Sequence, residues 1–175
     1  MLTSIARGAA AGAAGTTALH AATYLDMTLR GRPSSSTPQQ TIDKLSEAAG
    51  THIPGDAEKQ ESRKSGLGAL LGMVTGTTVG VGYGALHGLG WRPPMLVGAA
   101  VATVAAMVGS SAPMTVLGVT DPRTWSASDW VSDVLPHAAY GLVTAATYRL
   151  TEHGRSSRRC RRRVQRRPPL RRLVQ

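Results

Sequence analysis

Two long runs without formal charge constrain this chain more than any other feature. Residues 65–91 contain no Asp, Glu, Lys or Arg, and neither do residues 93–120, so only Arg92 separates them. Each run exceeds the roughly 20 residues that an α-helix needs to cross about 30 Å of hydrocarbon. Pro93 and Pro94 follow Arg92 and suit the start of a new helix, where a missing N–H costs little. The pattern predicts a transmembrane hairpin with Trp91 at the interface, where aromatic residues are enriched.

A third apolar segment precedes this hairpin. Residues 5–29 are mostly Ala, Gly, Thr and Leu, with Arg7 near the start and Asp26 near the end. A cleaved signal peptide is the alternative interpretation. Its core would be richer in Leu, it would carry more positive charge before the core, and an A-x-A site would follow. We therefore favour a membrane span.

A fourth segment, residues 130–150, is the least apolar of the four. Asp133 and Pro136 lie inside it, and Ser126 and Asp129 precede it in the arrangement of a capped helix start. The predicted spans are residues 5–29, 66–90, 94–119 and 130–150. Together they predict an all-α transmembrane bundle within a membrane domain of residues 1–153.

The composition agrees with a bundle in lipid. The chain has 20 glycines and no phenylalanine. Helices in a bilayer associate by close backbone approach, which favours small residues, whereas a soluble core gains from larger apolar side chains. A soluble Ala-rich bundle remains the alternative. It would need polar helix faces in residues 65–120, and these runs offer Thr, Ser and Gly but no charge.

A short amphipathic helix is predicted within the polar loop between the first two spans. Thr37 is the expected cap, with Pro38 in the first turn and Gln40 completing a capping box. Apolar residues then recur on one face of residues 38–49, and Gly50 ends the helix. We expect this helix to lie on the membrane surface or on the bundle.

A basic tail occupies residues 154–175. It holds half of the 20 basic residues, and the net charge of the whole chain is +10. Such a segment has little to bury, which predicts disorder. It can set topology by the positive-inside rule, bind anionic lipid head groups, or bind nucleic acid. We favour the first two, because no aromatic residues that could stack on bases interleave the arginines.

The residues expected to contact lipid head groups or another polyanion are Arg158, Arg159, Arg161, Arg162, Arg163, Arg166 and Arg167. The same arginines predict that the protein lies in the cell membrane with its C-terminus in the cytoplasm and residues 30–64 outside. Arg30 and Arg32 at the start of this loop, and Arg63 and Lys64 at its end, oppose this orientation. The single cysteine, Cys160, excludes an internal disulfide and a multi-cysteine metal site.

Glycine recurs at every fourth position along the second span. The stripe comprises Gly68, Gly72, Gly76, Gly80, Gly84 and Gly88. A ridge without side chains lets another helix approach closely. Rows of small residues on the first span (from Gly8) and on the third span (from Gly98) are possible partners. We favour packing within one bundle, with an interface between copies of the chain as the alternative.

Ionisable residues inside predicted spans are candidates for function, since each costs a few kcal/mol in lipid unless it is paired. Depth in the predicted topology groups His20, Asp26, Asp133 and His137 near the outer side and leaves His87 at the inner end. These groups can satisfy one another structurally, move protons, or bind a metal. We favour the structural interpretation and predict no metal and no cofactor.

Three stretches carry a resemblance to known proteins. They are "RGAAAGAAGTTALHAATYLDM", "RGRPSSSTPQQ" and "DVLPHAAYGLVTAATY". They resemble small multi-pass membrane proteins of unknown function from high-GC Gram-positive bacteria, and the D-x-x-P-H-x-x-Y-G element is similar to the YagU-like inner-membrane proteins. The resemblance covers residues 5–150, implies a location in the cytoplasmic membrane, and supplies no catalytic residue.

The sequence therefore predicts an integral membrane protein with a structural or accessory role through helix–helix contacts. Its expected partners are membrane lipids and a second copy or another membrane protein. The alternative is a small transporter or an ion- or proton-conducting protein that uses the intramembrane His and Asp residues. We do not expect an enzyme, because no nucleophile, base and oxyanion donor can be placed together.

Overall fold

The protein is all-helical over the residues that the structure describes. A computed structural model describes residues 1–165, with side chains up to Glu152. Its elements are α1 (Leu2–Arg30), α2 (Thr37–Ala48), α3 (Ala57–Gly88), α4 (Met95–Val116), the 3₁₀ turn η1 (Pro122–Thr124) and α5 (Ala127–Gln165). No strand occurs among these residues. The predicted all-α class is confirmed.

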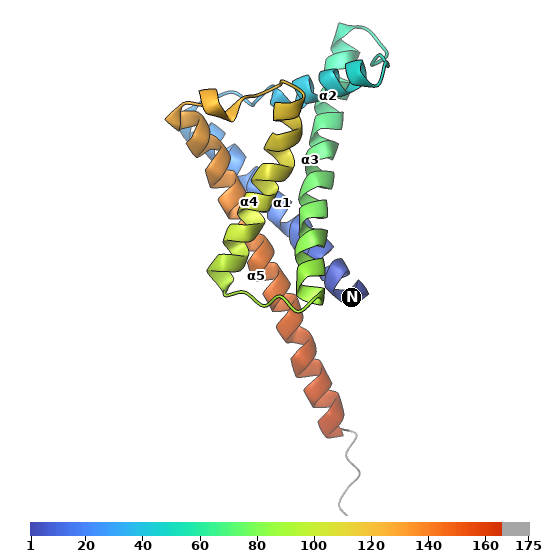
Figure 1. The fold of residues 1–175 in the computed structure, drawn as a ribbon, viewed down its shortest axis with the longest axis vertical. Helices are drawn as coiled ribbons and strands as arrows, with labels where there is room; N and C mark the ends of the chain where they lie inside the picture. Colours follow the sequence, from blue (N-terminus) through green and yellow to red (C-terminus); the bar gives the residue numbers. More distant parts are fainter. Residues whose placement is uncertain (166–175) are drawn as a thin grey trace, which may run out of the picture.

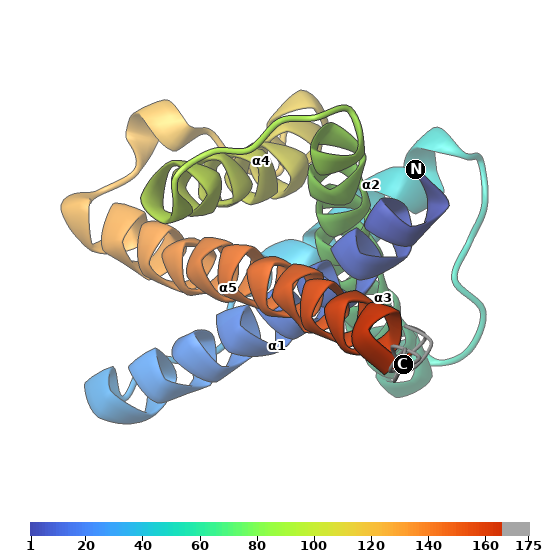
Figure 2. The same cartoon turned by 90° about the horizontal axis from the view of Figure 1, so that it is seen from below.

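The four long helices form a ring of antiparallel neighbours. α1 packs on α3 and α5, and α4 packs on the same two helices from the other side. Figure 2 shows α5 between α1 and α4. In Figure 1 the N-terminus, the α3–α4 turn and the departing part of α5 lie at one end of the ring, while α2 and the α4–α5 connection lie at the other. We call these the lower and upper ends, as in Figure 1.

Large apolar side chains point outward from this ring. α3 and α4 are long and apolar enough to cross a membrane. On them Leu70, Val74 and Val104 are each more than half exposed, whereas buried apolar positions include Ala11 and Ala102. Soluble proteins bury their large aliphatic residues preferentially. This structure instead exposes large aliphatic residues on both of these helices.

Helix α3 begins earlier than the uncharged run that predicted it. Asp56 is its N-cap, and one carboxylate oxygen accepts a hydrogen bond from the Lys59 backbone N–H at 2.9 Å. The helix start was set by this cap rather than by hydropathy. The polar residues 57–64 therefore belong to this helix, whereas the sequence analysis expected a helix only at residues 38–49 of the polar loop.

Helix α2 lies on the bundle. Its own residues Thr41 and Ile42 are buried, and Lys64 Nζ of α3 donates to an Asp43 carboxylate oxygen at 3.1 Å. This bond raises the pKa of Lys64 above its usual value. The predicted cap is displaced by one residue, because Ser36 is the N-cap and the Gln40 side chain donates to its hydroxyl at 2.9 Å.

Helix α5 starts at the predicted capping box. The backbone N–H of Ser126 donates to the Asp129 carboxylate at 2.9 Å, and that of Asp129 donates to the Ser126 hydroxyl at 3.2 Å. The Ser126 hydroxyl also lowers the pKa of Asp129. The helix continues to Gln165, and the disorder expected of residues 154–175 stays a prediction. Propagating an existing helix is easier than nucleating one, and Arg is a good helix former. Residues 166–175 lie outside the described part.

Candidate functional site

The closest helix contact joins α1 to α3 through facing glycines. A Cβ on Gly12 would lie 2.8 Å from the Cα of Gly80, and a Cβ on Gly8 would lie 2.8 Å from the Cα of Gly84. Ordinary van der Waals contact for such an atom begins at 3.4 Å. Only glycine fits at these four positions, because backbone atoms stand where a side chain would go. Gly88 ends the contact beside the start of α1.

The other glycines of the stripe have different neighbours. A Cβ on Gly76 would collide with the Thr16 hydroxyl of α1. Gly68 faces α2 instead, where a Cβ would lie 2.8 Å from Pro38, and Gly72 has no neighbour within 4 Å. The stripe therefore serves packing within this chain over most of its length. The small-residue row of α4 is not its partner.

Polar side chains hold the centre of the ring. The Tyr140 hydroxyl of α5 donates to the Gly76 carbonyl of α3 at 2.6 Å, and its ring is fully buried against Gly15 of α1. The Thr144 hydroxyl donates to the Ala11 carbonyl at 3.4 Å. These hydrogen bonds join α5 to α3 and to α1.

Asp26 is paired at the upper end of α1. Arg30 lies 3.3 Å from its carboxylate, and Arg32 contacts the second oxygen. Arg30 also donates to the hydroxyls of Ser128 at 2.6 Å and Ser132 at 2.9 Å. The carboxylate is therefore neutralised by two guanidinium groups, one of which links α1 to α5.

Asp133 and His137 lie together on α5, as their spacing of four residues predicts. The His137 Nδ1 atom is 3.4 Å from an Asp133 carboxylate oxygen and 2.7 Å from the Asp133 carbonyl. The other carboxylate oxygen is buried without a hydrogen-bond partner. The other imidazole nitrogen of His137, Nε2, lies 3.3 Å from the Ser110 hydroxyl of α4. Sequence reasoning did not identify Ser110 as a member of this group.

His20 does not join these groups through any hydrogen bond or ion pair within the described residues. It is half-buried on α1, and its ring centroid lies 6.1 Å from that of Tyr24. No three His, Cys, Asp or Glu side chains in the described part of the chain are placed to hold a metal ion. The four residues grouped by depth therefore do not form one site. Asp26 pairs with Arg30 and Arg32, Asp133 pairs with His137, and among the described residues His20 contacts neither group.

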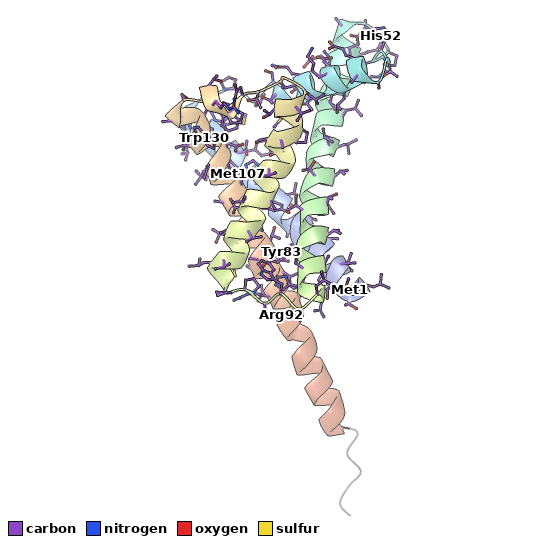
Figure 3. All side chains as sticks on the ribbon, in the orientation of Figure 1. Met1, His52, Tyr83, Arg92, Met107 and Trp130 are labelled. Atoms are coloured by element: carbon purple, nitrogen blue, oxygen red, sulfur yellow. The ribbon has the colours of Figure 1, made fainter. Side chains whose placement is uncertain are left out.

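An aromatic cluster at the lower end was missed by the sequence analysis. Tyr83, His87 and Trp91 meet Tyr148 of α5, with the His87 and Tyr148 ring centroids 4.3 Å apart. Figure 3 shows Tyr83 at this lower end, close to Arg92. Tyr83 and His87 are nearly fully buried, and the Tyr148 hydroxyl is buried without a hydrogen-bond partner in the described residues. The spacing of Tyr83, His87 and Trp91 was a visible signal, whereas the contribution of Tyr148 from a distant helix was not.

Arginines surround this cluster. Arg149 donates to the Pro93 carbonyl at 2.7 Å, and Arg92 pairs with Glu152. The expected lipid-binding arginines at positions 158–163 lie on the backbone of α5 beyond the bundle, and their side chains lie outside the described part. Arg166 and Arg167 lie outside the described residues altogether.

No protein-family model, curated protein or solved structure matches this chain. The resemblance carried by residues 5–150 therefore stays a prediction from its motifs.

Proposed function

We propose that this chain is a four-span integral membrane protein that acts as a structural or accessory component through helix–helix contacts. In this proposal α1, α3, α4 and α5 each cross the membrane, and the lower end of the ring faces the cytoplasm. The partners are lipids with anionic head groups near the basic tail, and a second copy or another membrane protein on the outer faces of the helices.

The observation that carries the proposal is where the large aliphatic side chains lie. Alanine, glycine, threonine and three tyrosines fill the interior, whereas Leu, Val and Met cover the outside of α3, α4 and the upper part of α5. In lipid this arrangement places apolar side chains against hydrocarbon and lets backbones approach closely. In water the same surface would present a contiguous apolar patch, which monomeric soluble proteins rarely expose.

The positions of tryptophans support the same orientation in a bilayer. Trp91 lies at the lower end in the α3–α4 turn, and Trp125 and Trp130 lie at the upper end with their ring centroids 5.0 Å apart. Tryptophan is enriched at both membrane interfaces. The lower end also receives the arginines of the continuing α5, which favours the cytoplasmic side for that end.

Two contacts in the interior of the bundle support a structural role. Tyr140 spans the centre from α5 to α3, and the glycine contact brings the α1 backbone against α3. Both features hold helices in a single arrangement. Neither presents a reactive group, so the contacts serve assembly rather than chemistry.

Cysteine labelling in intact cells tests whether α5 crosses the membrane together with α3 and α4. The native Cys160 should react with a membrane-impermeant maleimide only after the inner face is exposed. In a Cys160→Ser background, Arg92→Cys should behave like Cys160, while His52→Cys and Thr124→Cys should react from outside. If only α3 and α4 spanned, Cys160 would share a side with His52→Cys rather than with Arg92→Cys. That result would contradict the four-span proposal.

A reconstitution assay tests the structural role against transport. Liposomes containing the purified protein and a trapped pH-sensitive dye should hold an imposed pH gradient as long as empty liposomes do. Collapse of the gradient that is lost in a His137→Gln variant would refute a purely structural role and favour proton conduction.

A further inference from the structure

The hydrogen bonds around His137 determine which of its two ring nitrogens can gain and lose a proton. Nδ1 lies 2.7 Å from the Asp133 carbonyl oxygen. A carbonyl oxygen only accepts, so Nδ1 carries a hydrogen and donates it. The second nitrogen, Nε2, is therefore the atom at which the neutral and the charged ring differ.

Ser110 can serve Nε2 in both forms of the ring. Its Oγ lies 3.3 Å from Nε2 and 3.1 Å from the carbonyl oxygens of Ala106 and Met107. A hydroxyl has one hydrogen to donate and lone pairs that accept. When the ring is neutral, Ser110 donates to Nε2. When the ring is protonated, Nε2–H donates to Oγ, and Ser110 turns its hydrogen to a carbonyl of its own helix.

Asp133 supplies the charge that a protonated ring requires. One of its carboxylate oxygens lies 3.4 Å from Nδ1, and the other is buried with no hydrogen-bond partner. An ionised carboxylate in such a place is costly unless an opposite charge stands beside it. A positive ring would stabilise the carboxylate, and the carboxylate would stabilise the ring.

The other ionisable groups near this level do not replace Asp133. Helix α4 contains no ionisable side chain between Met95 and Val116. On α1, Gly15 faces Tyr140 and Arg30 faces Ser128 and Ser132, so His20 lies nearest the level of His137, and Asp26 and Arg30 lie nearer the upper end of α5. There, Asp26 is already paired with Arg30 and Arg32.

We propose that Ser110, His137 and Asp133 form a proton-binding site that joins α4 to α5 near the upper end of the ring. One proton from water on the upper side attaches to the lone pair of Nε2, the Ser110 hydroxyl reverses, and Asp133 remains ionised as the counter-charge. No bond is broken apart from the one that held the proton to water. The site goes beyond helix packing, because a purely structural contact has no need of two hydrogen-bonded states.

Nitrogen NMR of the imidazole rings tests the site directly. The full-length protein, labelled with ¹⁵N-histidine in lipid nanodiscs, would be followed from neutral to acidic pH, with the His137 signals assigned by their loss in His137→Gln. We expect a single neutral form protonated on Nδ1 at high pH and a doubly protonated form at low pH. A ring that stays neutral down to the pH at which the protein unfolds would overturn the proposal.

Two variants and a matched control separate this role from a structural one. Ser110→Ala removes the acceptor for Nε2–H and should lower the ratio of protonated to neutral His137 at a fixed acidic pH by several-fold, up to about tenfold, since a hydrogen bond to a charged group is stronger than a neutral one. Asp133→Asn should lower it in the same direction. Ser111→Ala, the neighbouring serine, should leave it unchanged.

Equal ratios in Ser110→Ala and Ser111→Ala would overturn the proposal. Thermal melting of each variant in the same nanodiscs reports whether it is folded. If Asp133→Asn fails to fold, the comparison of the two serine variants decides the outcome alone.

Discussion

Gly80 offers the sharpest test of the packing between α1 and α3. A Cβ at this position would lie 2.5 Å from the Cα and 2.7 Å from the N of Gly12. Ordinary contact begins at 3.4 Å, so Gly80→Ala requires the two backbones to separate by about 1 Å. Neither backbone can rotate aside as a flexible side chain would, and the neighbouring glycine contacts would loosen with it.

Gly82 supplies the matched control two residues away. It lies on the same helix, is exposed, and has no atom within 4 Å of a Cβ. Replacing either glycine by alanine gains about 1 kcal/mol of helix propensity, so this gain cancels when the variants are compared. What remains is the overpacking at Gly80, about 1–3 kcal/mol.

Thermal unfolding in one detergent, monitored by circular dichroism, measures this difference. We expect Gly82→Ala to melt at or above the wild-type temperature and Gly80→Ala to melt below it. Gly80→Leu should be worse than Val79→Leu for the same reason. Equal melting temperatures for Gly80→Ala and Gly82→Ala would mean that α1 does not lie against this face of α3, and the reasoning would fail.

Three further outcomes are expected. Tyr140→Phe keeps the ring but loses the bond to the Gly76 carbonyl, so the free energy of unfolding should fall by about 1 kcal/mol in the same melting assay; an unchanged value would show that the bond is not formed. Gly141→Ala places a Cβ against the backbone of α4 and should lower thermal stability, whereas a neutral effect would contradict that contact. Asp56→Ala should speed hydrogen exchange in the first turn of α3, and Asp56→Ser should restore protection. Hydrogen bonds from Lys59 lower the pKa of Asp56. The cap is therefore complete above the ordinary pKa of 3.8 and is lost as the pH falls through the lower pKa of the folded protein. Hydrogen exchange that responds neither to Asp56→Ala nor to this fall in pH would exclude the cap.

The candidate polar site was predictable only along single helices. The pairing of Asp133 with His137 follows from a spacing of four residues, which places both on one face of any α-helix. Ser110 could not be assigned, because no spacing rule relates positions on two helices. Tyr148 was missed for the same reason, although the spacing of Tyr83 and His87 was visible. His20 and Asp26 were grouped with Asp133 by depth, yet depth says nothing about the direction in which each helix face points.

The sequence by itself determined where the helices form, and only the tertiary structure decided which helix packs against which. The uncharged runs of residues 65–91 and 93–120 identify apolar helices because a charge in hydrocarbon is costly wherever the helix lies. The glycines from Gly68 to Gly88 likewise predict close helix packing from a single segment of the sequence. That α1, rather than α4, lies against Gly76, Gly80 and Gly84 depends on the rotation and register of each helix. Those two quantities follow from packing summed over all the helices at once, and no single segment contains that sum.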